Sequence, residues 1–247
     1  MSDTVVTPLE MFYRWEQETP DKVYLRQPKN LEWSEYTWRE VADKVRRIAA
    51  FLQAQDYPAG SRIGIWSSNS MDWPIVDLAI MLSGHISVPI YPGQDIDSAN
   101  YIFNHSEVRL VFCGDFDQYA RVAEALPEGV TTVAMLGCKF ETDNTLESIY
   151  ESFEPYAGSP VPNPEDVFTI IYTSGTTGNP KGVMHMHQTP GHVVPGLVKA
   201  FHLDQEPNEF FSFPAHVPRC GAHRGGDVQP VCQRQHFLLG GPGDLWR

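Results

Sequence analysis

Residues 172–182 read Tyr-Thr-Ser-Gly-Thr-Thr-Gly-Asn-Pro-Lys-Gly and continue a short apolar run that covers residues 168–172. The run is β-branched and aromatic, which predicts a buried strand. Glycines after a strand let the backbone turn its N–H groups toward an anion, and Lys181 adds a positive charge. Lys181 is the only formally charged residue between Asp166 and Lys199, in a chain of net charge −13. The segment therefore predicts a phosphate-binding loop.

Two other interpretations of this segment were weighed. Its Ser, Thr and Gly content is also typical of a mobile surface loop with no ligand. The P-loop of nucleotide triphosphatases requires Gly directly before the Lys and a hydroxyl directly after it. Here Pro180 precedes Lys181 and Gly182 follows it, so the P-loop interpretation fails.

The segment, continued to Met184, resembles the phosphate-binding motif of the adenylate-forming superfamily. From Thr7 to Phe213 the order of segments is similar to the start of a long-chain fatty acyl-CoA synthetase. The similar segments are residues 36–40, 60–65, 69–73 and 88–92. The last of these, Val-Pro-Ile-Tyr-Pro, favours the long-chain subgroup.

The resemblance implies an ATP-dependent ligation of a fatty acid to coenzyme A through an acyl-adenylate, with Mg²⁺ on the phosphates. Lys181 would stabilise the charge of the leaving pyrophosphate and is the expected catalytic residue. Gly175 and Gly178 would supply backbone conformations and close approach. The residues expected to contact phosphate oxygens through hydroxyl and amide groups are Thr173, Ser174, Thr176 and Thr177.

Helix and strand patterns alternate along the chain, which predicts an α/β fold with a doubly wound sheet and covering helices. The resemblance makes this an incomplete N-terminal domain of the adenylate-forming fold. Expected helices cover residues 9–18, a stretch that starts with a Thr37/Glu40 capping box, a stretch capped by Asp72, and residues 116–125. Expected strands cover residues 62–66, 86–90, 108–113, 131–135, 168–172 and 182–187.

Four segments are expected in the domain organisation. Residues 1–154 form an N-terminal α/β subdomain, and residues 155–165, which contain Pro155, Pro160, Pro162 and Pro164, form a Pro-rich linker. Residues 166–213 form the phosphate-loop part of the AMP-binding domain, and residues 214–247 form an anomalous, disordered tail. Because a second strand is expected directly after the loop, the loop should connect two strands. His185 and His187 alternate onto one face of that strand, but no third ligand at a sensible spacing accompanies them.

The tail has a composition unlike the rest of the chain, with no Ser, Thr, Asn, Lys, Glu, Ile, Met or Tyr. One interpretation is a small zinc site built from Cys220, His223, Cys232 and His236. The other is a frameshift after Phe213, because similar proteins continue from this point into Leu-Pro-Leu-x-His-x-x-Glu-Arg. Codons allowed for residues 216–228 permit His, Glu and Arg in that order when read one base later. The DNA sequence downstream of the Phe213 codon distinguishes the two interpretations.

The composition of the chain limits which binding partners and which cellular compartment are expected. Four cysteines without a secretory leader indicate a reducing, cytoplasmic location. The most apolar window, residues 73–91, is interrupted by Asp77, Gly84 and His85, so a buried helix and strand are expected there and no transmembrane span. Peripheral contact of the protein with a membrane surface remains an open alternative. The excess of acidic over basic residues argues against nucleic acid as a binding partner.

Two hypotheses about the activity of the polypeptide itself remain. It is a catalytically incomplete part of an acyl-CoA ligase, inactive by itself, because the other motifs of the resembled family lie beyond these residues. Alternatively, it is a phosphate- or nucleotide-binding regulatory or scaffold module without ligase activity.

Overall fold

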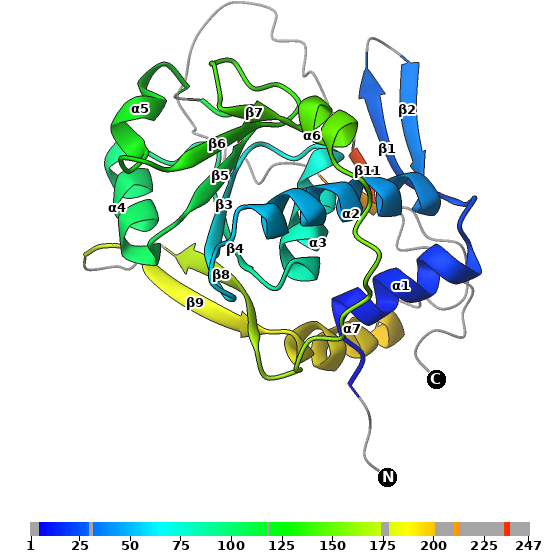
Figure 1. Cartoon of the computed structure of the whole chain (residues 1–247). Helices are drawn as coiled ribbons and strands as arrows, with labels where there is room; N and C mark the ends of the chain where they lie inside the picture. The colour runs from blue at the N-terminus through cyan, green and yellow to red at the C-terminus, as the bar shows by residue number, and fades with distance from the viewer. Residues whose placement is uncertain are drawn as a thin grey trace, which may run out of the picture.

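The computed structural model describes residues 5–29, 32–117, 119–173 and 178–200, together with the backbone of residues 210–212 and 235–237. Helices and strands alternate through these residues (Figure 1). The helices are α1 (Pro8–Glu18), α2 (Trp38–Ala54), α3 (Asp72–Leu82), α4 (Ile96–Ser106), the 3₁₀ turn η1 (Tyr119–Arg121), α5 (Val122–Ala125), α6 (Leu146–Ser152) and α7 (Gln188–Ala200). The strands are β1 (Val23–Lys29), β2 (Glu32–Thr37), β3 (Arg62–Trp66), β4 (Ile86–Ile90), β5 (Leu110–Cys113), β6 (Thr131–Ala134), β7 (Asn144–Thr145), β8 (Val167–Thr173), β9 (Lys181–Met186), β10 (Phe210–Ser212) and β11 (Gln235–Phe237).

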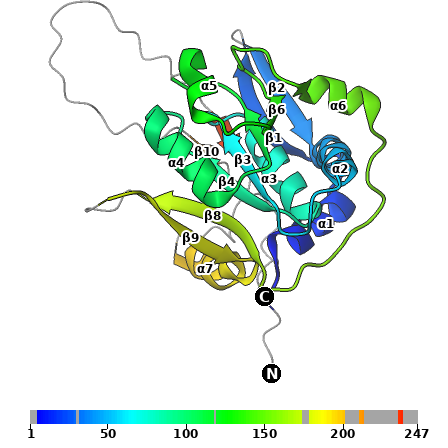
Figure 2. The ribbon, with the colours of Figure 1, turned by 60° about the vertical axis from the view of Figure 1, so that its left-hand side comes forward.

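A seven-stranded sheet forms the centre of the molecule, in the order β7-β6-β5-β3-β4-β8-β9. Its strands run parallel except for β9, which pairs antiparallel with β8 at one edge. The chain steps from β3 outward to β4 and then crosses back over β3 to β5, so successive helices fall on opposite faces. Figures 1 and 2 show α2 and α3 on one face and α4 and α5 on the other. The prediction of a doubly wound α/β sheet with covering helices is confirmed.

Each face of this sheet carries its own apolar core. One core joins the sheet to α1, α2, α3 and α6, and the other joins it to α4 and α5. The neighbouring residues Ile65 and Trp66 of β3 belong to different cores because successive side chains of a strand point to opposite faces. Both are fully buried, which explains why β3 is a short continuous apolar run instead of an alternating one.

The capping box predicted for α2 is confirmed, and the cap predicted for α3 is wrong. The Thr37 hydroxyl accepts from the Glu40 N–H, and the Glu40 carboxylate accepts from the Thr37 N–H at 2.7 Å. If Asp72 were the N-cap, α3 would begin at residue 73. The helix begins at Asp72 instead, because Met71 before it already has helical backbone angles. Asp72 therefore lies inside the first turn, and its carboxylate accepts from the Leu136 N–H at 2.8 Å.

Two predicted boundaries are also wrong. The strand predicted from residue 108 begins at Leu110, because Glu107 closes α4 in the left-handed conformation and the Val108 N–H donates to the Phe103 carbonyl. The helix predicted over residues 116–125 is only η1 and α5, with residue 118 outside the described part of the chain. The buried Phe116 ring packs on the Trp66 ring, with the ring centroids 4.1 Å apart. This contact fixes residue 116 against the sheet, and the helical residues begin only after it.

The segment predicted as a Pro-rich linker runs along α1 and α2. Arg46 of α2 donates to the Tyr156 and Gly158 carbonyls at 3.1 and 2.7 Å, and the Tyr13 hydroxyl donates to the Pro160 carbonyl at 2.9 Å. The same Arg46 guanidinium pairs with Glu16 of α1 at 2.7 Å. The segment delivers the chain to β8, while the four-segment division of the chain stays a prediction.

A second sheet has the order β10-β11-β1-β2, and β11 lies within the segment predicted as an anomalous tail. Its backbone pairs antiparallel with β1 and with β10. The remainder of residues 214–247 lies outside the described residues, and so do the side chains of Cys220, His223, Cys232 and His236. The frameshift therefore stays a prediction.

The apolar window over residues 73–91 forms α3 and β4, as the sequence predicts. Within the described parts of the chain, no helix combines the length and apolar character needed to cross a membrane.

Candidate phosphate-binding site

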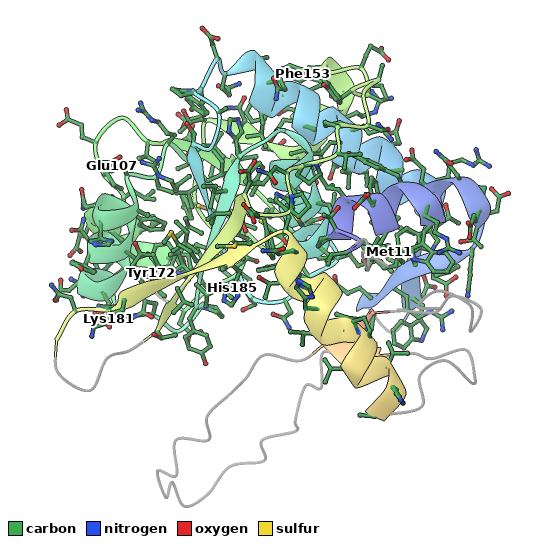
Figure 3. The ribbon with its side chains drawn as sticks, turned by 90° about the horizontal axis from the view of Figure 1, so that it is seen from below. Met11, Glu107, Phe153, Tyr172, Lys181 and His185 are labelled. Atoms are coloured by element: carbon green, nitrogen blue, oxygen red, sulfur yellow. The ribbon has the colours of Figure 1, made fainter. Side chains whose placement is uncertain are left out.

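The predicted phosphate loop lies at the turn of the β8–β9 hairpin. The two strands are antiparallel, with Thr173 opposite Lys181 and Ile171 opposite Val183. Figure 3 labels Tyr172 on β8 and Lys181 on β9. The loop therefore connects two strands, as predicted, and no helix N-terminus lies directly behind it. Affinity for an anion must come from loop amides, hydroxyl groups and the lysine.

The described residues bring two of the predicted phosphate contacts together. Thr173 ends β8 and Lys181 begins β9, and because they are registered partners their side chains lie on the same face of the hairpin. Both side chains are exposed at the end of the hairpin where the loop connects the two strands, so they are accessible to a ligand. Gly178 has a φ of +130°, a conformation that L side chains rarely adopt, and an added Cβ would meet no atom of the described residues within 4 Å. Backbone conformation, not crowding, requires glycine there.

The predicted site residues Ser174, Gly175, Thr176 and Thr177 lie outside the described residues. Their hydroxyl, amide and backbone roles stay predictions.

Gly182 is required for a different reason, which is close packing across the hairpin. An added Cβ would lie 2.8 Å from the Ile170 Cγ2 and 3.2 Å from the Tyr172 Cζ. The first distance is shorter than real Cβ contacts, so a side chain at residue 182 would displace β8 or the Tyr172 ring. The glycine after the lysine thus allows β8 and β9 to pack closely beside the turn.

Tyr172 anchors the base of the loop to α4. Its hydroxyl lies 2.7 Å from Nδ1 of His105, and the two rings meet edge to face. The Tyr101 ring stacks on the His105 ring, with the ring centroids 5.3 Å apart. Burial raises the pKa of the Tyr172 hydroxyl, which keeps it protonated and able to donate at neutral pH. His105 could not be found from the sequence, because its contact with Tyr172 spans 67 residues and no local pattern marks it.

The two histidines of the hairpin differ in environment. His187 is buried against the Phe168 ring, and burial lowers its pKa, so it is neutral at pH 7. His185 is partly exposed opposite Thr169. Among the residues that the structure places, no three His, Cys, Asp or Glu side chains group in a way that could hold a metal ion.

A cavity of about 290 Å³ lies away from the hairpin. It is lined by the β1–β2 strands, by α2 and α6, and by the start of α3, with Lys44, Asp72 and Tyr150 as its prominent polar side chains. The Lys44 ammonium sits 4.0 Å above the Tyr150 ring, so an internal cation already covers the aromatic wall. None of the lining residues belongs to β8 or β9, and the cavity is thus separate from the phosphate loop.

Comparisons with known proteins agree with this geometry. A family model described as "AMP-binding enzyme" matches residues 12–205. The chain is 29% identical over 204 residues to the "Long-chain-fatty-acid--CoA ligase FadD15" of Mycobacterium bovis, which covers 78% of this chain and 33% of that protein. It is 30% identical over 172 residues to "Fatty acyl-CoA synthetase A" of Dictyostelium discoideum, which covers 62% of this chain and 25% of that protein. The chain thus spans a third or less of the length of these relatives.

A solved structure of similar fold is the anthranilate CoA ligase AuaEII in complex with anthranoyl-AMP. It has a TM-score of 0.67 at 20% identity, over 81% of this chain and 38% of that one. This likeness shows that the doubly wound sheet is the N-terminal part of the adenylate-forming fold.

Proposed function

The chain belongs to the AMP-binding enzyme family, and from this membership we propose that its β8–β9 hairpin binds the phosphates of ATP in a long-chain fatty acid–CoA ligase. The observation that carries the proposal is the exposed pair Thr173 and Lys181, which lies at the loop end of a glycine-containing hairpin. The named relatives act on fatty acids, and the Val-Pro-Ile-Tyr-Pro piece at residues 88–92 favours the same substrate class.

The proposed reaction has two steps. A fatty carboxylate oxygen attacks the α-phosphorus of ATP, the bond to the β-phosphate oxygen breaks, and pyrophosphate leaves. The thiolate sulfur of coenzyme A then attacks the acyl carbon, and AMP leaves with the former carboxylate oxygen. Free acid, ATP and thiol thus become thioester, AMP and pyrophosphate.

The first step brings two anions together in a protein of net charge −13, so electrostatics must favour it locally. Lys181 is the only formal charge between Asp166 and Lys199, so no carboxylate on the hairpin opposes its attraction for phosphate. We assign Lys181 to the β- and γ-phosphate oxygens, where negative charge grows as pyrophosphate leaves. Hydroxyl and amide groups at residues 173–178 would orient the same oxygens.

Magnesium is the ion expected to accompany ATP in such a reaction. The described residues contain no grouping of three acidic, His or Cys side chains that fits it, so no step is derived for the ion. The family function concerns the whole enzyme, of which this chain represents a part.

Substrate class is tested with a version of the gene product read in frame beyond Phe213. Thioester formation from ATP and coenzyme A would be measured with palmitate, octanoate, acetate and an amino acid at equal concentrations. We expect the highest kcat/KM for palmitate. Preference for acetate or the amino acid would contradict the fatty acid assignment, and ATP binding without any ATP-dependent product would favour the regulatory-module alternative.

A further inference from the structure

The end of β8 that leads into the phosphate loop lies beside α4 (Figures 1 and 2). On its other side, β8 joins the rest of the sheet through one registered backbone pair among the described residues, Ser87 of β4 with Thr169. Residues 170–173 follow this pair toward the loop, and their registered partners lie on β9. Because β9 is the last strand of the described sheet, its pairing with β8 does not by itself fix the loop end of the hairpin to the molecule.

Tyr172 connects this end of the hairpin to α4. Its hydroxyl oxygen lies 2.7 Å from Nδ1 of His105, and the two rings meet edge to face, with planes at 89°. The Tyr101 ring, one helical turn before His105 on α4, stacks on the His105 ring. Across the hairpin, the Tyr172 ring lies so close to Gly182 that an added Cβ would be 3.2 Å from Cζ. The Tyr172 ring is thus held between α4 and β9.

The hydrogen bond between Tyr172 and His105 does not require one protonation state of the imidazole. A tyrosine hydroxyl can donate to an unprotonated ring nitrogen and can accept from a protonated one. Burial raises the pKa of the Tyr172 hydroxyl, so the hydroxyl keeps its proton at neutral pH. The contact is therefore available whether His105 is neutral or charged.

The residue after Tyr172 is Thr173, whose registered partner is Lys181. Successive side chains of a strand point to opposite faces, so the face that Tyr172 turns toward α4 determines the face on which Thr173 lies. A rotation of β8 about its own axis would turn Thr173 and its partner Lys181 together. The contact between Tyr172 and His105 opposes that rotation one residue before the loop begins.

We propose that His105 of α4 is a positioning residue for the phosphate loop, which holds the Tyr172 hydroxyl and so fixes the direction in which Thr173 and Lys181 face a bound phosphate. His105 acts through Tyr172 and touches no substrate. The effect on nucleotide affinity rests on the proposed function, whereas the effect on the strand does not.

Two substitutions at residue 105 separate the hydrogen bond from ring packing. His105→Phe keeps an aromatic ring against Tyr172 and Tyr101 but has no polar atom at the Nδ1 position. His105→Asn removes the ring and keeps a polar group near that position, able to donate or accept. His105 is exposed, so both variants should keep the core intact. If the hydrogen bond positions the strand, His105→Asn resembles the wild type more than His105→Phe does, and if ring packing alone matters, the order is reversed.

Hydrogen exchange of the purified chain at about pH 7, followed by mass spectrometry, tests the strand contact without nucleotide. Strand β6 is the internal control because it belongs to the same sheet and is not a neighbour of β8. We expect the protection of β8 relative to β6 to fall roughly twofold to fivefold in both His105→Phe and Tyr172→Phe. This is the lower part of the range for one hydrogen bond, because His105 is exposed to solvent. The double variant should lose no more protection than either single variant, since each removes the same bond.

Calorimetric titration of the same variants with ATP tests the consequence for the loop. We expect His105→Phe and Tyr172→Phe to raise the dissociation constant by similar factors, roughly twofold to fivefold, and His105→Asn to raise it less. A merely structural role would not give this result, because an unfolded fraction lowers the number of binding sites and leaves the dissociation constant of the folded protein unchanged.

Wild-type protection of β8 in both phenylalanine variants, lower protection in His105→Asn than in His105→Phe, or additive losses in the double variant would overturn the proposal. Should His105→Asn fail to fold, the two phenylalanine variants and their double variant decide. If Lys181→Ala weakens ATP binding and His105→Phe does not, the positioning role fails while the proposed function stands. If the chain binds no ATP, the proposed function fails, and the exchange experiment still decides whether His105 holds β8.

Discussion

Replacing Lys181 by Ala in a version read in frame beyond Phe213 should slow fatty-acid-dependent exchange of pyrophosphate into ATP by about 10- to 1000-fold, the range for loss of one preorganised electrostatic contact. The exposed Lys181 ammonium lies at the start of β9, beside the loop. It is the only formal charge on the β8–β9 hairpin. Exchange reports the adenylation half-reaction alone, in which charge on pyrophosphate develops. The effect should appear both in the KM for ATP and in kcat, because the same contact holds the phosphates of bound ATP and strengthens as the leaving group departs.

A matched control is Lys199→Ala, which removes an exposed lysine from the end of α7 and should leave the exchange rate within about twofold of the wild type. Equal exchange rates for the wild type and Lys181→Ala, with both proteins folded, would show that Lys181 does not belong to the proposed site. The loop would then be interpreted as an ordinary surface turn.

Trp66→Ala should lower the free energy of unfolding by about 3–5 kcal/mol, the usual cost of removing a large aromatic side chain from a core. Trp66 is fully buried, stacks on Phe116 at 4.1 Å and tilts against Phe103 at 5.6 Å, so neighbouring rings on two other elements would face a cavity. Urea unfolding followed by circular dichroism measures the loss. The change should appear in the midpoint with little change in the slope.

Trp33→Ala is the comparison for this variant, because Trp33 of β2 is 47% exposed. Its loss of stability should be clearly smaller. Trp66→Phe should cost less than Trp66→Ala, since the Trp66 Nε1 donor has no acceptor among the described residues and phenylalanine retains most of the packing. A Trp66→Ala loss no larger than that of Trp33→Ala would contradict the placement of β3 between two cores.

Local patterns predicted much of the central sheet. The bounds of β3 and β4 agree with the sequence prediction because both strands are short apolar runs set off by turns. The α2 start was predictable since its capping box is contained within four residues. The strand-to-strand loop was predictable from the β-branched residues on both sides of it.

Other elements were missed or misplaced. The hairpin of β1 and β2 and the helices α4 and α7 were not predicted, and α7 even contains Pro195. Asp72 satisfies a local capping pattern, yet its carboxylate bonds to Leu136, 64 residues away in sequence. Tertiary partners override local preference in such cases.

The candidate site shows the same division. Lys181 and the glycines could be found from sequence because a phosphate loop is a contiguous motif. The groups that hold its strand could not, because His105 of α4 and Ser87 of β4 meet β8 only in the folded sheet. Their residue types are ordinary at those positions, and no spacing connects them.

Calorimetric titration of the purified chain with ATP tests whether the β8–β9 hairpin binds nucleotide phosphates. We expect that ATP binds, that tripolyphosphate displaces it while adenosine does not, and that Lys181→Ala weakens binding by roughly 10- to 100-fold, as expected for one charge-assisted contact. The absence of ATP binding, displacement by adenosine but not by tripolyphosphate, or equal dissociation constants for the wild type and Lys181→Ala would contradict phosphate binding by the hairpin.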